Sequence, residues 1–406
     1  MVPEGWSRRT LGEIARITSG GTPERAEPSY WGGDIPWVTT GEIQFNTITD
    51  TTEKITESGL KNSSAKLFPP GTLLMAMYGQ GKTRGQVAKL GIEAATNQNS
   101  AAILLQPDQD PDYHFHYLAA RYEEIREFGH SGGVSHLNAS LLKLIEIPCA
   151  PFEQQQYIGR MLSVWDNAIA ATERLLANSR KQKNDLMSML LRRSRTRPNG
   201  DAFRTVELSS LFERVARKNA EGNDNVLTIS AQHGLISQRD FFNKSVASKD
   251  LSGYTLLKRG EFAYNKSYSN GYPVGAIKPL LAYEAGVVSS LYLCFRLRDG
   301  AEADQDFFRH YFEAGMLDDD IAGIAQEGAR NHGLLNVGIA EFFGLQLRVP
   351  NLEAQRRIAK VLNTAEAEEQ AIAKQIDHLR SEKRALMADL LTGKRRVRLT
   401  AAEATP

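Results

Sequence analysis

Two segments of the chain repeat each other, and this repeat restricts the fold more than any other feature. Residues 153–191 and 353–391 align without a gap at an offset of 200, so that Ile158 matches Ile358. Both segments end in the pattern LM-x-x-LL, and a basic run follows each of them. The offset of 200 residues between the copies exceeds the 20–50-residue period of solenoids. It indicates an internal duplication of a larger unit.

The stretches that precede the two segments echo each other more weakly. FPPGTLLMAMYG (68–79) resembles LKRGEFAYNKSY (257–268), and NSAAILL (99–105) resembles SSLYLCF (289–295). Short β-like runs in both regions are interrupted by glycine and proline, as in strands joined by turns. The predicted order is therefore domain, long helix, domain, long helix.

Each repeated segment has the length and periodicity of a long helix. About 40 residues give a helix of roughly 60 Å. From Ile158 and from Ile358, positions spaced by four and three residues are apolar in seven of ten and eight of ten cases. The helices are predicted to pair as an antiparallel coiled coil. The residues predicted to pair are Ile158, Leu162, Ile169, Leu176, Leu186, Ile358, Leu362, Ile372, Ile376 and Leu386.

Packing of each helix on its own domain is the alternative to this pairing. A domain of about 150 residues is only about 30 Å across, which is shorter than the predicted helices. The predicted fold class is therefore α+β, with two duplicated domains, two paired helices and approximate two-fold symmetry. The predicted boundaries are 1–150 and 199–350 for the domains, 151–198 and 351–398 for the helices, and 399–406 for a disordered tail.

Composition excludes several classes of protein. With 406 residues, 41% of them hydrophobic, and a net charge of +1, the chain is an ordinary globular protein without global basicity. No apolar run approaches the ~18 residues that cross a bilayer. Cys149 and Cys294 are too far apart for a metal-site motif, and a reducing cytoplasm is the expected location.

The Gly81-Lys82-Thr83 triplet resembles the end of a nucleotide-binding phosphate loop. That loop needs a glycine five residues before the triplet, where this chain has Ala76. The surrounding residues 73–90 fit a strand, a tight turn and a strand better than a strand and a helix. Motifs of hydrolases, metalloproteases and cofactor-binding folds are also missing, so no catalytic residue is predicted. His114 and His116 lie two apart on a predicted helix and are expected to be structural.

Polar and aromatic side chains gather in corresponding turns of the two domains. Lysine and arginine neutralise phosphates and read guanine, whereas asparagine and glutamine read adenine. The turn sequences differ between the domains, which suggests two different targets. The candidate DNA-binding residues are Tyr78, Gln80, Lys82, Thr83, Arg84, Asn97, His136, Lys266, Tyr268, Asn270, Arg330 and Asn331. A solvated turn is the alternative for each residue taken singly.

Together these stretches resemble the specificity subunit of type I restriction–modification systems. The stretches are GWSRRTLGEIARITSGGTP, DIPWVTTGEI, the FPPGTLLMAMYGQG-to-ATNQN region, and the two helical copies ending in LM-x-x-LL. The resemblance implies two target-recognition domains, each binding one half of a bipartite sequence in double-stranded DNA. The helices would set the distance between the half-sites.

The resemblance also implies partners. Two modification (adenine-methyltransferase) subunits would dock on the helices, and restriction subunits would join that core. S-adenosylmethionine, ATP and Mg would bind to those partners, and this chain would be non-catalytic and bind no cofactor or metal. A recognition subunit of another DNA-modification or defence complex, and a scaffold whose two domains bind proteins, remain open as alternatives.

Overall fold

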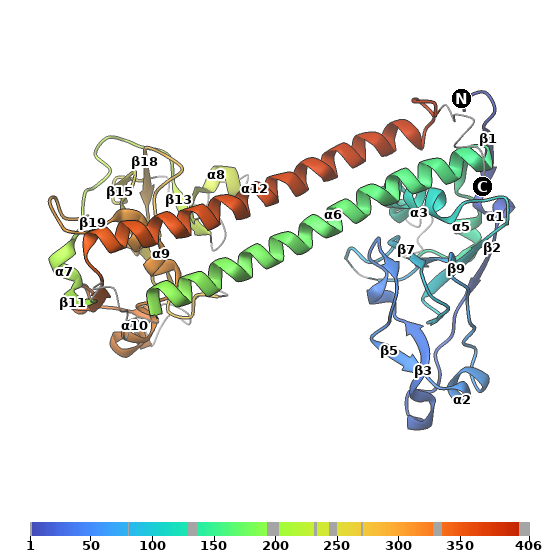
Figure 1. Ribbon diagram of the computed structural model, residues 1–406, viewed down its shortest axis with the longest axis horizontal. Helices are drawn as coiled ribbons and strands as arrows, with labels where there is room; N and C mark the ends of the chain where they lie inside the picture. The colour runs from blue at the N-terminus through green and yellow to red at the C-terminus, as the bar shows by residue number, and fades with distance from the viewer. Residues whose placement is uncertain are drawn as a thin grey trace. The chain divides into compact units, whose positions relative to one another are not determined.

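The computed structural model describes residues 2–79, 81–128, 136–192, 203–230, 234–242, 250–268, 271–327 and 335–397. The contacts between residues divide the chain into two units, 1–174 with 374–406, and 175–373. Each unit contains one domain and one half of each long helix (Figure 1). Both unit boundaries therefore fall inside a helix. The predicted tail 399–406 lies outside the described residues.

The first domain is built mainly of short strands. The strands are β1 (Ser7–Thr10), β2 (Ala15–Ser19), β3 (Trp31–Val38), β4 (Thr47–Ile48), β5 (Glu53–Ile55), β6 (Leu73–Ala76), β7 (Val87–Leu90), β8 (Ala95–Thr96), β9 (Ser100–Leu105) and β10 (Glu146–Cys149). The helices are α1 (Leu11–Ile14), α2 (Glu57–Lys61), α3 (Pro111–Ala120), α4 (Tyr122–Glu127) and α5 (Ala139–Lys143), with 3-10 turns at Pro28–Tyr30 and Thr40–Glu42.

The strands of the first domain form a main sheet in the order β2-β9-β6-β7-β4 and a smaller sheet in the order β5-β3-β8. Strands β6 and β7 are antiparallel, with Leu73 opposite Lys89. The strand–turn–strand prediction for residues 73–90 is thus confirmed. All four residues of β6 are buried, because the main sheet is covered on both faces. Strand β1, the first of the domain, pairs with β10, the last, so the two ends of the domain lie side by side.

The second domain uses a matching set of elements. The strands are β11 (Arg204–Glu207), β12 (Phe212–Arg214), β13 (Leu227–Ser230), β14 (Gly234–Ser237), β15 (Thr255–Lys258), β16 (Phe262–Asn265), β17 (Ala276–Pro279), β18 (Ala285–Val288), β19 (Leu293–Leu297), β20 (Gln326–Glu327), β21 (Leu335–Asn336) and β22 (Gln346–Val349). The helices are α7 (Leu208–Leu211), α8 (Gln238–Phe242), α9 (Gln305–Glu313), α10 (Asp318–Ile324) and α11 (Ile339–Phe343).

The topology of the second domain confirms the duplication. Its main sheet has the order β12-β19-β16-β17, which repeats β2-β9-β6-β7 strand by strand. The β11–β22 ladder repeats the β1–β10 ladder. The α+β fold class is confirmed in both domains. The described parts of the domains differ in two places: strand β4 extends the main sheet of the first domain only, and the second domain has the pairs β13–β14 and β15–β18 where the first has β5-β3-β8.

The two long helices are α6 (Phe152–Met187), continued by a π-helical turn at Ser188–Arg192, and α12 (Leu352–Leu390). Ion pairs join the helices within each unit, and those of the first unit establish their relative direction. In the first unit, Lys383 pairs with Asp166 and Arg380 pairs with Glu173. In the second unit, Lys183 and Arg180 both pair with Glu369, at 2.6 and 2.9 Å. Residue numbers rise along one helix as they fall along the other, so the predicted antiparallel pairing is confirmed.

The apolar stripes of the helices are covered in two ways. None of the twenty positions in the two 4,3 series is exposed, whereas Val164, Leu175 and Val361, which lie off the series, are exposed. Toward the helix ends the stripe joins a domain core. Ile158 belongs to the core cluster of the first domain, and Ile358 belongs to that of the second. Packing on a domain, the alternative to pairing, therefore holds at the ends of both helices.

A buried glutamine joins the start of each long helix to its domain. Gln155 accepts from the backbone N–H of Asp110 at 3.0 Å and donates to the Ala150 carbonyl at 2.8 Å. Gln355 makes the same bonds to Asp304 and Pro350, both at 2.9 Å. Each aspartate in turn caps the N-terminus of α3 or α9 with its side chain. The two main bonds of the junction are thus duplicated, whereas the third differs, since Gln155 also donates to the Gln109 side chain at 3.3 Å and Gln355 to the Glu302 carbonyl at 3.4 Å.

Candidate nucleic-acid interface

In each domain, one edge of the main sheet collects three loops. Strand β9 runs antiparallel to both β2 and β6, so its start lies beside their ends. This loop edge of the first domain comprises residues 20–22, 77–79 and 97–99. The loop edge of the second domain comprises residues 215–218, 266–268 and 289–292, next to β12, β16 and β19. Four of the eight described candidate residues lie at these edges: Tyr78, Asn97, Lys266 and Tyr268.

In the first domain, Tyr78 presents the main aromatic surface of the loop edge. Its ring is 41% exposed and stacks on His136, with centroids 4.8 Å apart and planes at 12°. His136 comes from the segment that precedes α5, so the structure brings together two candidates that are far apart in the sequence. An exposed, pre-stacked pair of rings offers a flat platform for a sugar or a base.

The tip of the β6–β7 loop is held by its backbone. Tyr122 donates its hydroxyl to the Lys82 carbonyl, and Arg126 donates to the Gly81 carbonyl. These bonds from α4 leave the side chain of Lys82 exposed and that of Thr83 half-buried. Lys82 is therefore positioned to meet an anion at the surface of the loop.

Two candidates of the first domain support the loops instead. The side-chain carbonyl of Asn97 accepts from Asn99 N–H at 3.1 Å and from the Ser100 hydroxyl at 3.0 Å, and its amide donates to Thr40 at 2.9 Å. These bonds occupy most of the groups that would read a base. Arg84 is only 7% exposed, a position that suits packing under the loop better than contact with a ligand.

In the second domain, Lys266 and Tyr268 follow β16 at the loop edge, and Tyr268 is 65% exposed. The carbonyl of Lys266 accepts from Leu335 N–H at 2.9 Å, just as that of Met77 accepts from Leu137 N–H at 3.0 Å. The two loops therefore leave their sheets in the same way. The other candidates, Gln80, Asn270, Arg330 and Asn331, lie outside the described residues.

Sequence reasoning missed two cations at the loop edge of the second domain. Arg214 ends β12, and Lys218 follows in the next loop; both are exposed. The run ERVARKNA (213–220), basic residues directly after a strand, was a signal for them. Its importance depends on strand order, because only the placement of β19 between β12 and β16 brings this loop beside Lys266.

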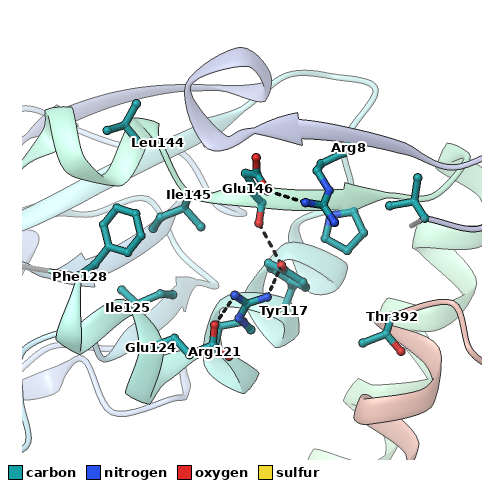
Figure 2. A pocket seen from close by; sticks show the side chains of 12 residues that line it. Arg8, Tyr117, Arg121, Glu124, Ile125, Phe128, Leu144, Ile145, Glu146 and Thr392 are labelled. Atoms are coloured by element: carbon teal, nitrogen blue, oxygen red, sulfur yellow. Dashed lines mark hydrogen bonds and ion pairs between the residues drawn. The ribbon is translucent and has the colours of Figure 1, made fainter.

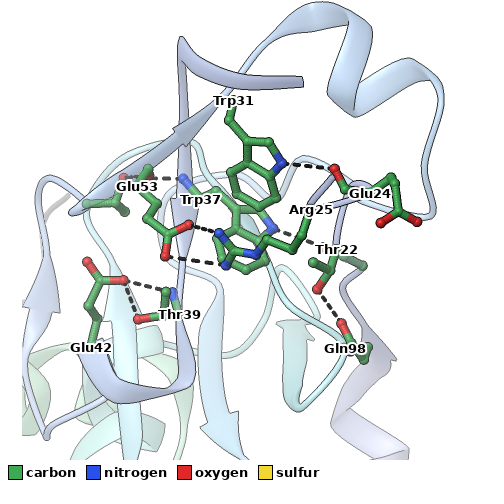
Figure 3. Close-up of polar contacts among 11 residues, drawn as sticks. Thr22, Glu24, Arg25, Trp31, Trp37, Thr39, Glu42, Glu53 and Gln98 are labelled. Carbon is green, nitrogen blue, oxygen red and sulfur yellow. Dashed lines mark hydrogen bonds and ion pairs between the residues drawn. The ribbon is translucent and has the colours of Figure 1, made fainter. Parts of the chain in front are cut away.

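The motif DIPWVTTGEI serves the architecture of the first domain (Figure 3). Trp37 is buried and donates its indole N–H to the Gly21 carbonyl at 2.9 Å. The Arg25 guanidinium lies 3.9 Å from the Trp31 ring centroid and pairs with Glu53. These contacts join the smaller sheet to the loop that follows β2. Trp37 of this motif therefore contributes to the scaffold of the first domain rather than to its loop edge.

A cleft of about 600 Å³ lies near α4 and the β1–β10 ladder (Figure 2). Its cations already have partners: Arg8 pairs with Glu146 at 2.8 Å, and Arg121 pairs with Glu124. An anion would have to displace these carboxylates. We therefore do not assign this cleft to nucleic acid.

The histidines of α3 are core residues, in agreement with the sequence analysis. His114 is fully buried and lies 2.9 Å from the Gln109 carbonyl oxygen. Burial disfavours the charged imidazole and lowers the pKa of His114 to about 3. Among the described residues, no cluster of three metal-ligating side chains occurs, and no helix is long and apolar enough to cross a membrane.

Comparison with known proteins shows which family the first half of the chain resembles. Residues 3–178 match the family model described as type I restriction modification DNA specificity domain. The chain is 28% identical over 195 residues to the MjaIX specificity subunit of Methanocaldococcus jannaschii, which covers 47% of this chain and 43% of that protein. It is 27% identical over 164 residues to the EcoR124I/EcoR124II specificity subunit of Escherichia coli, which covers 39% and 40%. The chain thus spans somewhat less than half the length of these relatives.

Solved structures extend the similarity of fold to the whole chain. The S subunit of a type I restriction–modification system from M. genitalium superposes with a TM-score of 0.59 at 15% identity, covering 96% of both chains. A chain from a structure of type I restriction–modification complex assembly gives 0.57 at 16% identity, covering 97% and 100%. Residues 3–178 are thus similar to the DNA specificity domain of type I restriction–modification systems, and the whole chain shares its duplicated fold with the solved S subunit.

Proposed function

We propose that this chain reads a bipartite sequence in double-stranded DNA, one half with each loop edge. The observation that carries the proposal is that one architecture, present twice, carries different side chains at the same edge. The first domain presents the Tyr78–His136 stack and Lys82, whereas the second presents Lys266, Tyr268 and the Arg214 cation. Phosphate contacts position a protein on DNA and contacts with base edges specify the sequence. Two different edges would specify two different half-sites.

We further propose that the long helices set the half-site spacing and dock two modification subunits. Val164, Leu175 and Val361 support a docking role, because they are exposed apolar residues outside the paired stripe. S-adenosylmethionine, ATP and Mg would bind to the partner subunits, and restriction subunits would complete the complex. On this proposal the chain works in the cytoplasm of the host cell.

The proposal is tested by single-molecule sequencing of methylated adenines. DNA from cells that carry this gene with its neighbours is compared with DNA from the same cells after deletion of the gene. The expected result is a split motif, two short specified blocks around an unspecified gap, that disappears on deletion. Binding of purified chain to proteins but not to DNA at low salt would support the scaffold alternative instead.

Helix length should control the gap in this motif. The units meet at 174–175 in α6 and at 373–374 in α12. Inserting seven residues at both places keeps the heptad phase and lengthens each helix by about 10 Å. The gap is expected to grow by about three base pairs at 3.4 Å per base pair, with both half-sites unchanged. Methylated-adenine sequencing measures it.

Insertion at 174–175 alone is the control for this prediction. It shifts α6 against α12 by one heptad on one side of the insertion, so the ion pairs of one unit lose their register. Methylation should then weaken without a clean change of gap. A double insertion that leaves the gap at its original length, with recognition intact, contradicts the role of the helices as a spacer.

A further inference from the structure

The loop edge of the second domain contains a small cleft whose charged lining is entirely basic. The cleft has a volume of about 150 Å³ and is lined by Arg214, Lys218, Lys266, Ser290 and Tyr292, among others. Its described lining includes no carboxylate. We propose that this cation cleft binds a backbone phosphate of the DNA, and that it makes the second domain the main electrostatic anchor of the chain. The inference rests on the proposed function.

The charges of the cleft are available for a ligand. Within the described residues, neither Arg214 nor Lys266 has a carboxylate within 4.0 Å, and Lys218 donates to a neutral acceptor, the Gly253 carbonyl, at 2.9 Å. Three neighbouring cations repel one another in the free protein. An anion that enters the cleft would relieve this repulsion.

The nearby carboxylates are held by other arginines. Glu261 accepts two hydrogen bonds from Arg217, at 2.8 and 2.6 Å. Glu213, next to Arg214 in sequence, pairs with Arg296 at 2.5 Å and with Arg298 at 3.5 Å. These pairs keep both acids from neutralising the cleft. The 600 Å³ cleft of the first domain shows the opposite arrangement, since its arginines are paired with its own glutamates.

The described part of the first domain lacks the cations of this cleft. Ile17 lies opposite one residue of β9, and Arg214 lies opposite the equivalent residue of β19. Ile17 is therefore the counterpart of Arg214 in the first domain. Met77 is the counterpart of Lys266, since their carbonyls accept from Leu137 and Leu335. Both Ile17 and Met77 are apolar and nearly buried. The cations are thus a property of the second copy alone.

The same region of the first domain is also closed sterically. A Cβ atom added to Gly20 would lie 1.9 Å from the Thr96 carbonyl oxygen, so the two loops touch through backbone. Thr22 and Gln98 are hydrogen-bonded across the same gap. In the second domain, residues at the corresponding loops, among them Arg214 and Ser290, line the cleft instead.

The donors of the cleft suit a phosphodiester. A guanidinium and two ammonium groups supply charge, and the exposed Ser290 hydroxyl can donate to a phosphate oxygen. Such contacts carry no sequence information and fix the position of the protein on the duplex. The second domain would therefore anchor the backbone through the cleft, while Tyr268 approaches the bases.

The test uses the full chain and a 20-base-pair duplex of random sequence. Binding is measured over a series of salt concentrations for wild type, for Arg214→Gln with Lys266→Gln, and for the control Lys258→Gln. Lys258 is an exposed lysine at the end of β15 away from Thr255, which lines the cleft. Removing one cation from a phosphate lowers the magnitude of the slope of log K against log salt by about one. The slope of the double variant should fall by at least that much, and the control should keep the wild-type slope.

The outcomes separate the cleft from the proposed function. A double variant that keeps the wild-type slope and melts like wild type overturns the assignment of the cleft but leaves DNA recognition intact. Wild type that binds no DNA at low salt overturns both. Inorganic phosphate is the second probe, added at matched ionic strength to wild type and to the double variant. If phosphate raises the melting temperature of wild type but not of the double variant, and the two proteins have equal salt slopes for DNA binding, the cleft binds free phosphate rather than DNA.

Discussion

Replacing residues 203–349 by the corresponding domain of a relative should change one half of the DNA target completely and leave the other half unchanged. The ends of this segment lie together, because Arg204 is paired with Val349 in the β11–β22 ladder. The graft therefore enters and leaves the chain at one place. Methylated adenines are sequenced in cells that carry the chimaera, and the new half-site should be that of the donor.

The grafted domain can fold only if its core side chains pack against the two long helices of this chain. Met187, Leu191, Ile358 and Leu362 from the helices belong to the core cluster of the second domain, so a donor with similar side chains at these positions is required. The reciprocal graft of residues 7–149, where Ser7 is paired with Cys149, is the matched control and should change the other half-site. A change in both halves from either graft would refute independent reading.

Gln355→Leu should destabilise the second unit by about 2–5 kcal/mol. Leucine is close to glutamine in size but removes the three hydrogen bonds of a fully buried side chain, to Asp304, Pro350 and Glu302. The Asp304 N–H and the Pro350 carbonyl would be left buried without this partner, and each unsatisfied group costs about 1–3 kcal/mol. The change also loosens Asp304, which caps α9 through the Phe307 N–H at 2.9 Å. Urea unfolding measures the change in the free energy of unfolding.

Two matched variants sharpen this prediction. Gln155→Leu removes the equivalent bonds in the first unit and should cost a similar amount, with hydrogen exchange accelerated in α3 rather than in α9. Gln375→Leu, at an exposed position of α12, should be nearly neutral. A destabilisation below about 1 kcal/mol for Gln355→Leu would mean that water replaces the glutamine at little cost.

The sequence specified the helices more fully than the sheets. Every position of the 4,3 pattern is covered in α6 and α12, because an amphipathic helix must repeat its packing along its length. The sequence similarities between the strands of the two domains were less accurate as alignments. Aligning NSAAILL with SSLYLCF places Ile103 opposite Leu293, whereas sheet register makes Phe295 its counterpart, two residues later. Strands that are buried on both faces have no alternation to fix their phase.

The candidate site was predictable in position but less so in its individual residues. The β6–β7 turn is polar and exposed at Tyr78 and Lys82, as its composition suggested. Asn97 is occupied by its own turn, and Arg84 is buried; neither property is visible in a string of polar letters. The position of Arg214 beside Lys266 depends on the strand order, which is a non-local property of the fold and cannot be inferred from the residues around Arg214.

Each long helix is divided between the two units. As a result, the second domain completes its core during synthesis before the first domain does. The core of the second domain needs residues up to Leu362. The core of the first domain contains Leu11 and Ile14 together with Leu390 and Leu391, which leave the ribosome almost 400 residues later. Domains otherwise tend to fold in the order of their synthesis. Here the domain that is made first is finished last, so a nascent chain stalled before Leu390 carries an intact second domain and a first domain with an open core.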